Sequence, residues 1–179
     1  MLSPMDIPVN ATLGNRLFFG CNNIHKITLS TANIADELFD GQKINELHIV
    51  KSKYDNIGNV SFAINNYTFG GGSWNVIDKV IVEPGVKSIE LSLIGINKLI
   101  VKGKNTKIIS YDMTKENINE TSLYTVKGAK AVKFARRWKA KYYAYKNAKN
   151  SKVAVKYTYK KKDGWKAVRK TMSKKLSAY

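Results

Sequence analysis

The stretch Ile24-His25-Lys26-Ile27-Thr28-Leu29 recurs three times further along the chain with the same pattern of aliphatic side chains. The first, fourth and sixth positions are aliphatic in every copy, and the third position is Lys or Glu. The other copies are Ile44-Asn45-Glu46-Leu47-His48-Ile49, Ile77-Asp78-Lys79-Val80-Ile81-Val82 and Ile96-Asn97-Lys98-Leu99-Ile100-Val101. They follow one another at intervals of 20, 33 and 19 residues, in and around the range of solenoid repeats. We therefore expect a mainly β fold in which short strands stack in parallel and bury their aliphatic sides against one another.

A phenylalanine and a glycine precede the first three copies. The pairs lie in Phe19-Gly20, Phe39-Asp40-Gly41 and Phe69-Gly70-Gly71. We expect each phenylalanine to fill the core from the arc that connects two strands. The glycine beside it would permit a tight bend at positive φ.

Two stretches resemble the BspA-like branch of the leucine-rich repeat family. Residues 18–29 read FFGCNNIHKITL, similar to the family pattern F-x-G-C followed by L-x-x-[IV]-x-[IL], and residues 84–89 read PGVKSI, similar to P-x-x-[VI]-x-x-I with one residue fewer after the proline. The resemblance covers about residues 15–111, with an insertion around residues 54–66 and no Phe-Gly turn before the fourth copy. It implies a short leucine-rich-repeat-like β body that binds proteins or surfaces and has no enzymatic activity. An ordinary antiparallel β domain is the alternative.

In such a stack, the third and fifth positions of each copy face away from the core. We expect these positions to form a docking face for other protein subunits. The alternative is that this surface only keeps the stack soluble, or that the chain packs its own C-terminal part on it. The residues of the predicted face are Lys26, Thr28, Glu46, His48, Lys79, Ile81, Lys98 and Ile100.

Charge divides the chain into two parts. Up to Tyr124 there are 12 basic and 12 acidic residues, whereas from Thr125 onward there are 19 basic residues and one acid, Asp163. A cluster of one sign raises the local electrostatic potential and favours an anionic partner. We therefore expect a neutral β-rich repeat-like domain over residues 1–123 and a strongly basic α/β or β appendage over residues 124–179.

The basic part contains two patterns of secondary structure. The helical spacing of Phe134, Trp138, Tyr142 and Tyr145 predicts a helix over about residues 129–148, with a strand over residues 138–145 as the competing interpretation. Residues 153–160 alternate apolar and polar side chains, and the following Asp163-Gly164 predicts a β-hairpin turn. We expect residues 173–179 to be frayed and solvated.

The density of lysine in this part predicts binding of a polyanion such as DNA, RNA or another anionic polymer or surface. Aromatic residues between the lysines are candidates for stacking on unpaired bases, with a place in the core as the alternative; they are Trp138, Tyr143, Tyr157 and Trp165. No zinc-finger or other nucleic-acid motif accompanies them, so we expect no sequence specificity. The expected polyanion-binding residues are Lys133, Arg136, Arg137, Lys139, Lys141, Lys156, Lys160, Lys161, Lys162, Lys166, Arg169 and Lys170.

We expect no catalytic residues, no metal site and no cofactor. The two histidines lie inside repeat strands, and Cys21 lies in a turn, which is too few ligands for zinc. The sequence lacks a membrane-spanning apolar run and a signal-peptide pattern, so a cytoplasmic or particle-associated protein is expected.

These observations lead to one hypothesis and two alternatives. We expect a non-enzymatic scaffold, or a virion or other assembly component, whose repeat body docks protein subunits and whose basic part contacts nucleic acid or another polyanion. The first alternative is a nucleic-acid-binding protein acting alone. The second is a surface adhesin-type repeat protein. The sequence leaves open whether copies of the chain associate with one another.

Overall fold

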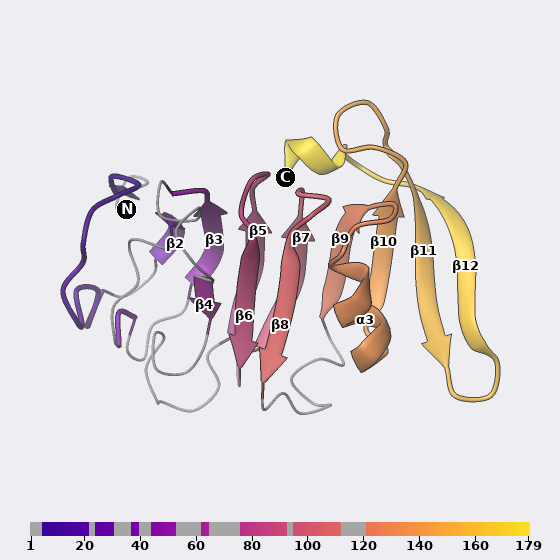
Figure 1. Cartoon of the computed structure of the whole chain (residues 1–179), viewed down its shortest axis with the longest axis horizontal. Coiled ribbons are helices and arrows are strands. Elements are labelled where there is room, and N and C mark those ends of the chain that lie inside the picture. The colour runs from indigo at the N-terminus through magenta and orange to yellow at the C-terminus, as the bar shows by residue number, and fades with distance from the viewer. Residues whose placement is uncertain are drawn as a thin grey trace.

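The structure is a computed structural model, and it describes residues 5–21, 24–30, 37–39, 44–52, 62–64, 76–92, 95–111 and 121–179. These residues build a solenoid-like stack of coils in two layers, with a β-hairpin at its C-terminal end (Figure 1). The expected mainly β fold with stacked parallel strands is confirmed.

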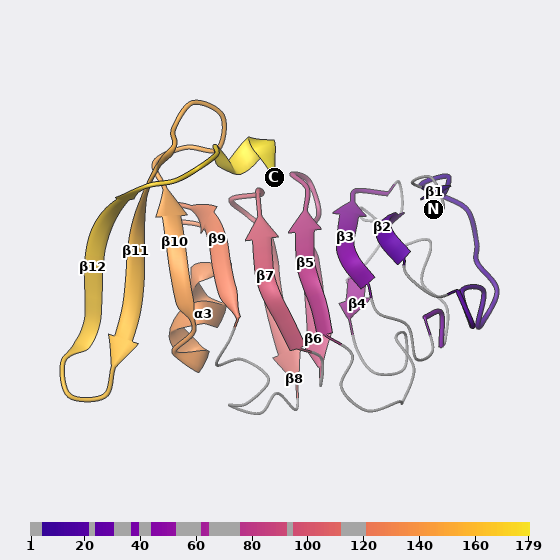
Figure 2. The same ribbon diagram turned by 180° about the vertical axis from the view of Figure 1, so that it is seen from behind.

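The first layer is a sheet that contains nine strands within the described residues. Those from β1 to β10 pair in parallel, and the last three pair antiparallel (Figure 2). In sheet order they are β1 (Met5–Asp6), β2 (Ile24–Ser30), β3 (Ile44–Val50), β5 (Val76–Val82), β7 (Gly95–Val101), β9 (Ser122–Val126), β10 (Lys141–Tyr145), β11 (Val153–Lys160) and β12 (Gly164–Thr171). The boundary expected at residues 123 and 124 lies inside β9, and the sheet continues through it.

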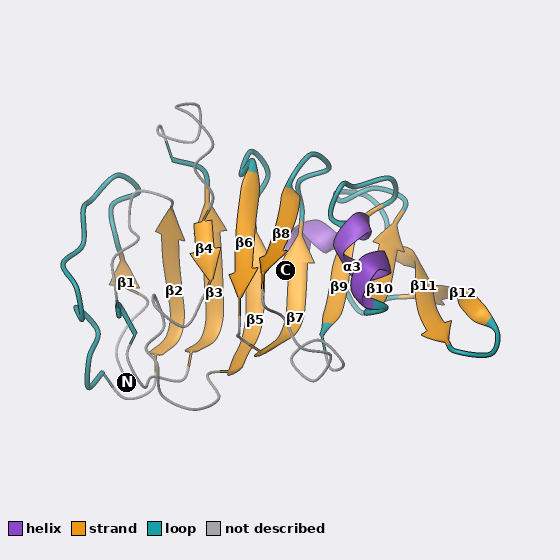
Figure 3. Ribbon diagram, turned by 60° about the horizontal axis from the view of Figure 1, so that its bottom comes forward, coloured by secondary structure: helices purple, strands orange, loops and turns teal. Residues whose placement is uncertain are grey.

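The second layer covers one side of this sheet. It consists of the parallel strands β4 (Phe62–Ile64), β6 (Ser88–Ser92) and β8 (Lys107–Tyr111). The helix α3 (Val132–Trp138) lies next to β8 and takes the place of a further strand (Figure 3). From β3 to β10, the chain therefore passes through the second layer between successive strands of the first.

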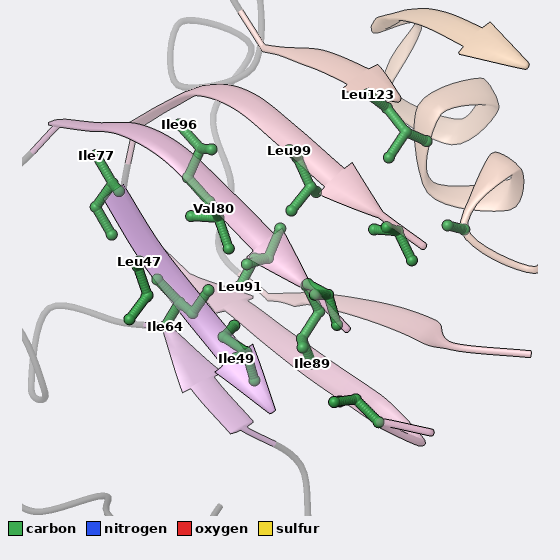
Figure 4. Packing of buried hydrophobic residues seen from close by; sticks show 14 of the residues in the cluster. Leu47, Ile49, Ile64, Ile77, Val80, Ile89, Leu91, Ile96, Leu99 and Leu123 are labelled. Carbon is green, nitrogen blue, oxygen red and sulfur yellow. The ribbon is translucent and has the colours of Figure 1, made fainter. Parts of the chain in front are cut away.

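The hexamer copies stack in the register that their aliphatic positions predict. Ile27 pairs with Leu47, Leu47 with Val80, and Val80 with Leu99. These fourth-position side chains are fully buried, as are those at the sixth position, and they meet Ile64, Ile89 and Leu91 of the second layer (Figure 4). Burying each such side chain contributes roughly 1.5–3 kcal/mol, so the stack of coils is held together mainly by this core.

The first position of the hexamer is buried in the last three copies and partly buried at Ile24, which requires a break in the alternation of the strand. Ile77 and Val80 both belong to the core although they are three residues apart, whereas a regular strand points such residues to opposite faces. The break lies at the second position, where polar side chains stack between coils. Asn97 Nδ2 donates to Asp78 Oδ1 at 3.1 Å, and Asn45 Nδ2 lies 3.1 Å from His25 Nδ1.

The arc before the first hexamer differs in part from the expectation. Phe18 fills the core and stacks on Phe39 with ring centroids 5.1 Å apart, whereas Phe19 is exposed. The prediction was wrong by one residue because two phenylalanines are adjacent there. Gly20 has the expected positive φ, at 73°. Residues 69–71 lie outside the described part of the chain.

The helix predicted over residues 129–148 is wrong beyond Trp138. Lys139 adopts a left-handed conformation with φ 58°, and the N–H of Ala140 donates to the Ala135 carbonyl at 2.9 Å, which closes the helix. The next residues form β10 because they pair in parallel with β9 and bury Tyr142 against the core. The competing strand interpretation is therefore right from Lys141 onward, and the predicted hairpin of β11 and β12 is confirmed.

The C-terminal segment, defined here as residues 173–179, is folded, and the expectation that it is frayed is wrong. It contains the 3₁₀ helix η3 (Leu176–Ala178), and Leu176 is fully buried. The N–H of Ser177 donates to the Ala148 carbonyl at 2.9 Å, and the Tyr145 hydroxyl lies 3.4 Å from the Lys174 carbonyl. Leu176 belongs to an apolar cluster with residues of the sheet, and this packing holds the segment in place.

Candidate polyanion interface

The open face is the side of the nine-stranded sheet that points away from the second layer. The third positions of the hexamers form one row across it, called the ladder here, because the register pairs Lys26 with Glu46, Glu46 with Lys79 and Lys79 with Lys98. The pairing continues to Ser122 and then to Lys141. The ladder predicted from the neutral repeats thus leads into the basic part of the chain.

Glu46 is the charged centre of this ladder. Lys79 donates a hydrogen bond to its Oε2, His48 Nε2 contacts its Oε1, and Lys26 Nζ lies 3.9 Å from the same oxygen. Burial opposes ionisation of the carboxyl, but the hydrogen bonds from Lys79 and His48 and the attraction to their charges lower the pKa of Glu46 below its ordinary value of 4.5. The ladder is thereby neutralised locally at its N-terminal end.

The fifth positions of the hexamers form a second row on the open face. The middle of this row is apolar, and the C-terminal segment covers that apolar part. Ile81 and Ile100 are fully buried in a small cluster with Tyr145, Ala154 and Leu176. The two isoleucines of the predicted docking face are therefore inaccessible while this segment is in place. The alternative interpretation, in which the chain packs its own C-terminal part on this face, describes what the structure shows.

A group of tyrosines surrounds the covered patch. Tyr124 stacks on Tyr143 with ring centroids 4.7 Å apart and meets Tyr179 at 5.6 Å. Burial, together with the neighbouring phenols of Tyr143 and Tyr179, raises the pKa of Tyr124 from 10.0 to about 12. Burial and a hydrogen bond with Tyr179 raise the pKa of Tyr145 well above its ordinary value. The phenols of Tyr124 and Tyr145 are therefore neutral at physiological pH, and their contacts with Tyr179 join the C-terminal segment to the sheet.

The hairpin of β11 and β12 carries one group of the predicted polyanion-binding residues. Val168 pairs with Lys156 and Lys170 pairs with Ala154, and Ala154 lies on the open face. Lys156, Lys160, Lys166 and Lys170 therefore share that face, Arg169 lies on the other one, and Lys161 and Lys162 form the turn. Every side chain from Lys166 to Thr171 is exposed.

The remaining predicted residues lie elsewhere. Lys133, Arg136, Arg137 and Lys139 are exposed on α3 and just after it, in the second layer. Lys141 lies on β10, in the first row of the open face. The predicted set is thus divided between two sides of the molecule, although both groups lie at its C-terminal end (Figure 1).

These basic residues have few acidic partners. Within the described part of the chain, the pair between Lys166 and Asp163, at 2.8 Å, is the one ion pair formed by a basic residue after Thr125. Both of its side chains are about half exposed, so the pair contributes little to stability. The positive charge of this end is therefore available to an external anion.

The four candidate stacking residues are engaged within the protein. Trp138 Nε1 donates to Ser110 Oγ at 2.8 Å, and Tyr143 stacks on Tyr124. Tyr157 stacks on Tyr142 at 4.5 Å, and Trp165 packs edge-on against the same ring at 5.4 Å. These rings extend the core at the C-terminal end of the stack.

Sequence reasoning missed a second group of lysines, which line a groove of about 940 Å³ over the outer side of the second layer. They are Lys87, Lys104, Lys107 and Lys130, and the groove also includes Glu90 and Tyr111. Three of the four lie in the neutral part of the chain, so the overall charge count conceals them. The sequence does contain a pattern that could have indicated this group of lysines. Glycine and lysine occur together in two of the turns that follow strands of the first layer, Lys102-Gly103-Lys104 and Lys127-Gly128-Ala129-Lys130.

Among the described residues there is no group of three or more His, Cys, Asp or Glu side chains placed to hold a metal ion. That part of the chain also has no helix with the length and apolar character needed to cross a membrane. Comparisons of the chain with family models, with curated proteins and with solved structures gave no match.

Proposed function

We propose that this protein is a non-enzymatic binding protein that holds nucleic acid through its phosphates, without sequence specificity, as a component of a larger assembly. The observation that carries this proposal is the density of exposed lysine and arginine on the β11–β12 hairpin and around α3, where Lys166–Asp163 is the one ion pair among the described residues. Lysine and arginine side chains that neutralise phosphates release the counterions condensed on the nucleic acid, and this release favours binding.

Protection of an exposed edge is the simplest other reason for lysines on the hairpin. Edge strands commonly carry lysine because it discourages pairing with other chains. That reason applies to β12, which pairs with β11 alone. It does not explain Lys156 and Lys160 on the inner strand, nor Lys161 and Lys162 in the turn. These lysines, which protection of the edge does not explain, support a role of the hairpin in binding.

The open face supports the assembly part of the proposal. The row from Lys26 to Lys98 carries charges of both signs beside Thr28 and His48, which suits contact with another protein subunit. The resemblance to leucine-rich repeats points to the same role. A particle component would occur in a fixed ratio to its neighbours, whereas a nucleic-acid-binding protein acting alone or a surface adhesin would not.

The test measures binding of the full chain to a labelled DNA duplex over a range of salt concentrations. We expect log K to fall linearly with log salt concentration, with a slope of about −0.9 per phosphate contacted. The variant K160Q/K162Q should bind more weakly and have a shallower slope. The matched control K26Q/K98Q removes the same charge from the open face of the repeats and should change binding little.

Two results would contradict the proposal. One is that K160Q/K162Q and K26Q/K98Q weaken DNA binding equally, which would show that only total charge matters. The other is an affinity of the wild-type chain that does not depend on salt.

A further inference from the structure

We propose that the groove over the second layer binds single-stranded nucleic acid, with its lysines on the phosphates and Tyr111 against an unpaired base. This inference rests on the proposed function, because it takes nucleic acid as the ligand. It adds a separate site, built largely from the neutral part of the chain.

The groove has a fixed frame. The N–H of Lys107 donates to the Lys87 carbonyl at 2.9 Å, and the N–H of Lys130 donates to the Lys104 carbonyl at 3.0 Å. Thr106, which is buried, donates its hydroxyl to the Val86 carbonyl at 2.8 Å. The turns of successive coils are therefore joined by hydrogen bonds, and the backbone of the groove needs little rearrangement to receive a ligand.

Gly103 keeps this frame closely packed. A Cβ atom at this position would lie 2.5 Å from Thr106 Oγ1, which is closer than real contacts allow. The same Cβ atom would lie 3.7 Å from the Cα atom of Pro84, so the absence of a side chain lets the turn approach both Thr106 and Pro84. The close approach places Lys104 next to the turn of the preceding coil.

The charges of the groove are poorly compensated. Its four lysines face one acid, Glu90, and none of the four has an ion pair with any described residue. Stacking brings Lys87 beside Lys107 and Lys104 beside Lys130, and like charges on neighbouring segments repel one another. A ligand with regularly spaced negative charges would relieve this repulsion, as a phosphate backbone does.

Tyr111 favours a single strand over a duplex. Its side chain is 53% exposed, at the end of β8, and it lines the same groove as the lysines. An exposed aromatic ring next to cationic side chains is the arrangement that binds unpaired bases by stacking. A duplex keeps its base faces stacked inside the helix, so it would meet the lysines but not the ring.

The experiment compares the affinity of the full chain for a labelled single-stranded oligonucleotide and for the duplex of the same sequence at one salt concentration. We expect K104Q/K107Q to weaken single-strand binding at least tenfold, with a smaller effect on the duplex. Y111A should weaken single-strand binding roughly fivefold or more and leave duplex binding unchanged. Y111F keeps the ring and should bind like the wild type.

The outcomes separate this inference from the proposed function. If the hairpin variant K160Q/K162Q weakens binding while the groove variants bind both ligands normally, the groove site is rejected and the proposed function stands. If the wild-type chain binds neither ligand, both are rejected. Equal effects of Y111A on both ligands would reject the stacking role of Tyr111. The lysine and tyrosine variants probe different contacts, so misfolding of one leaves the other decisive.

Discussion

At the scale of single residues, Glu46 shows what a repeat pattern determines and what it leaves undetermined. The aliphatic positions fix the register, and the register places Glu46 between Lys26 and Lys79. For this reason the ladder was predictable from sequence. The sequence did not predict that one carboxylate would contact Lys26, His48 and Lys79 together. The spacing of residues in a sequence carries no information on side-chain conformations.

Replacing Glu46 by Gln should lower the free energy of unfolding by about 1–2 kcal/mol, because charge-assisted hydrogen bonds to partly buried groups are lost. Urea unfolding measures this change. The control is Glu37→Gln, whose pair with Arg16 has both side chains about half exposed and should contribute less than about 0.5 kcal/mol. Equal losses in the two variants would show that Glu46 has no special role.

The same carboxylate predicts a pH dependence. Its pKa is lower in the folded protein than its ordinary value of 4.5, so its contribution to stability is complete above pH 4.5 and is lost as the pH falls through the folded-state value. Between these two values, the wild type should lose more stability than E46Q does. Acid unfolding curves of the two proteins that run parallel would contradict this assignment.

Tyr124 predicts the opposite behaviour in alkali. Its pKa is raised to about 12 from 10.0, so the unfolded chain loses the phenol proton first and the folded state loses stability as the pH rises between these values. Tyr124→Phe removes this dependence. We expect the variant to lose less stability than the wild type between pH 10 and pH 12, in denaturant unfolding followed by circular dichroism. Identical losses would contradict the raised pKa.

At the scale of elements, local signals succeeded where the decisive contacts are local. Asp163-Gly164 determines a tight turn by itself, and the hairpin was predicted correctly. Residues 134–145 mislead because aromatic side chains there fit both a helix and a strand. Pairing with β9 decides between helix and strand, because the segment with Tyr142 and Tyr145 pairs in parallel with it. No local sequence pattern contains that information.

The C-terminal segment is an element whose position depends on one side chain. Leu176→Ala should destabilise the protein by about 2–3 kcal/mol, or detach the segment while the rest stays folded, because Leu176 is fully buried against Ile81 and Ile100. Either result should increase binding of a hydrophobic dye, since the apolar patch becomes exposed. Calorimetry and dye fluorescence measure the two effects.

Ser177→Ala is the matched control for this prediction. Ser177 lies in the same 3₁₀ helix, its side chain is exposed, and its hydrogen bond to Ala148 uses the backbone. The control should behave like the wild type. Unchanged stability and unchanged dye binding in the leucine variant would show that the segment does not cover the patch in solution.

At the scale of the whole molecule, the charge division seen in the sequence does not follow the shape. Folding brings Lys87, Lys104 and Lys107 of the neutral part to the same groove as Lys130 of the basic part. A count along the chain averages these lysines with acids that lie elsewhere in the fold. The basic groove could therefore be recognised only from the structure, whereas the basic hairpin was evident from the amino-acid composition.

The net charge of +18 makes one prediction about the whole molecule, which is that salt should have opposite effects on folding and on binding. Repulsion among unpaired lysines opposes the compact state, and salt screens it over about 10 Å at 0.1 M. Raising the salt concentration should therefore raise the melting temperature, by about 2–4 °C for each kcal/mol of repulsion removed. The same salt should weaken nucleic-acid binding, because the release of counterions into a more concentrated salt solution gains less entropy.

Removing charge from the hairpin tests the shared origin of the two effects. In K160Q/K162Q, both the rise of melting temperature with salt and the fall of affinity with salt should be smaller than in the wild type, since the same ammonium groups cause both. A melting temperature that falls with salt would mean that ion pairs such as Lys79–Glu46 and Lys102–Glu83 outweigh the repulsion. Binding to nucleic acid would then have to be explained without electrostatic strain in the free protein.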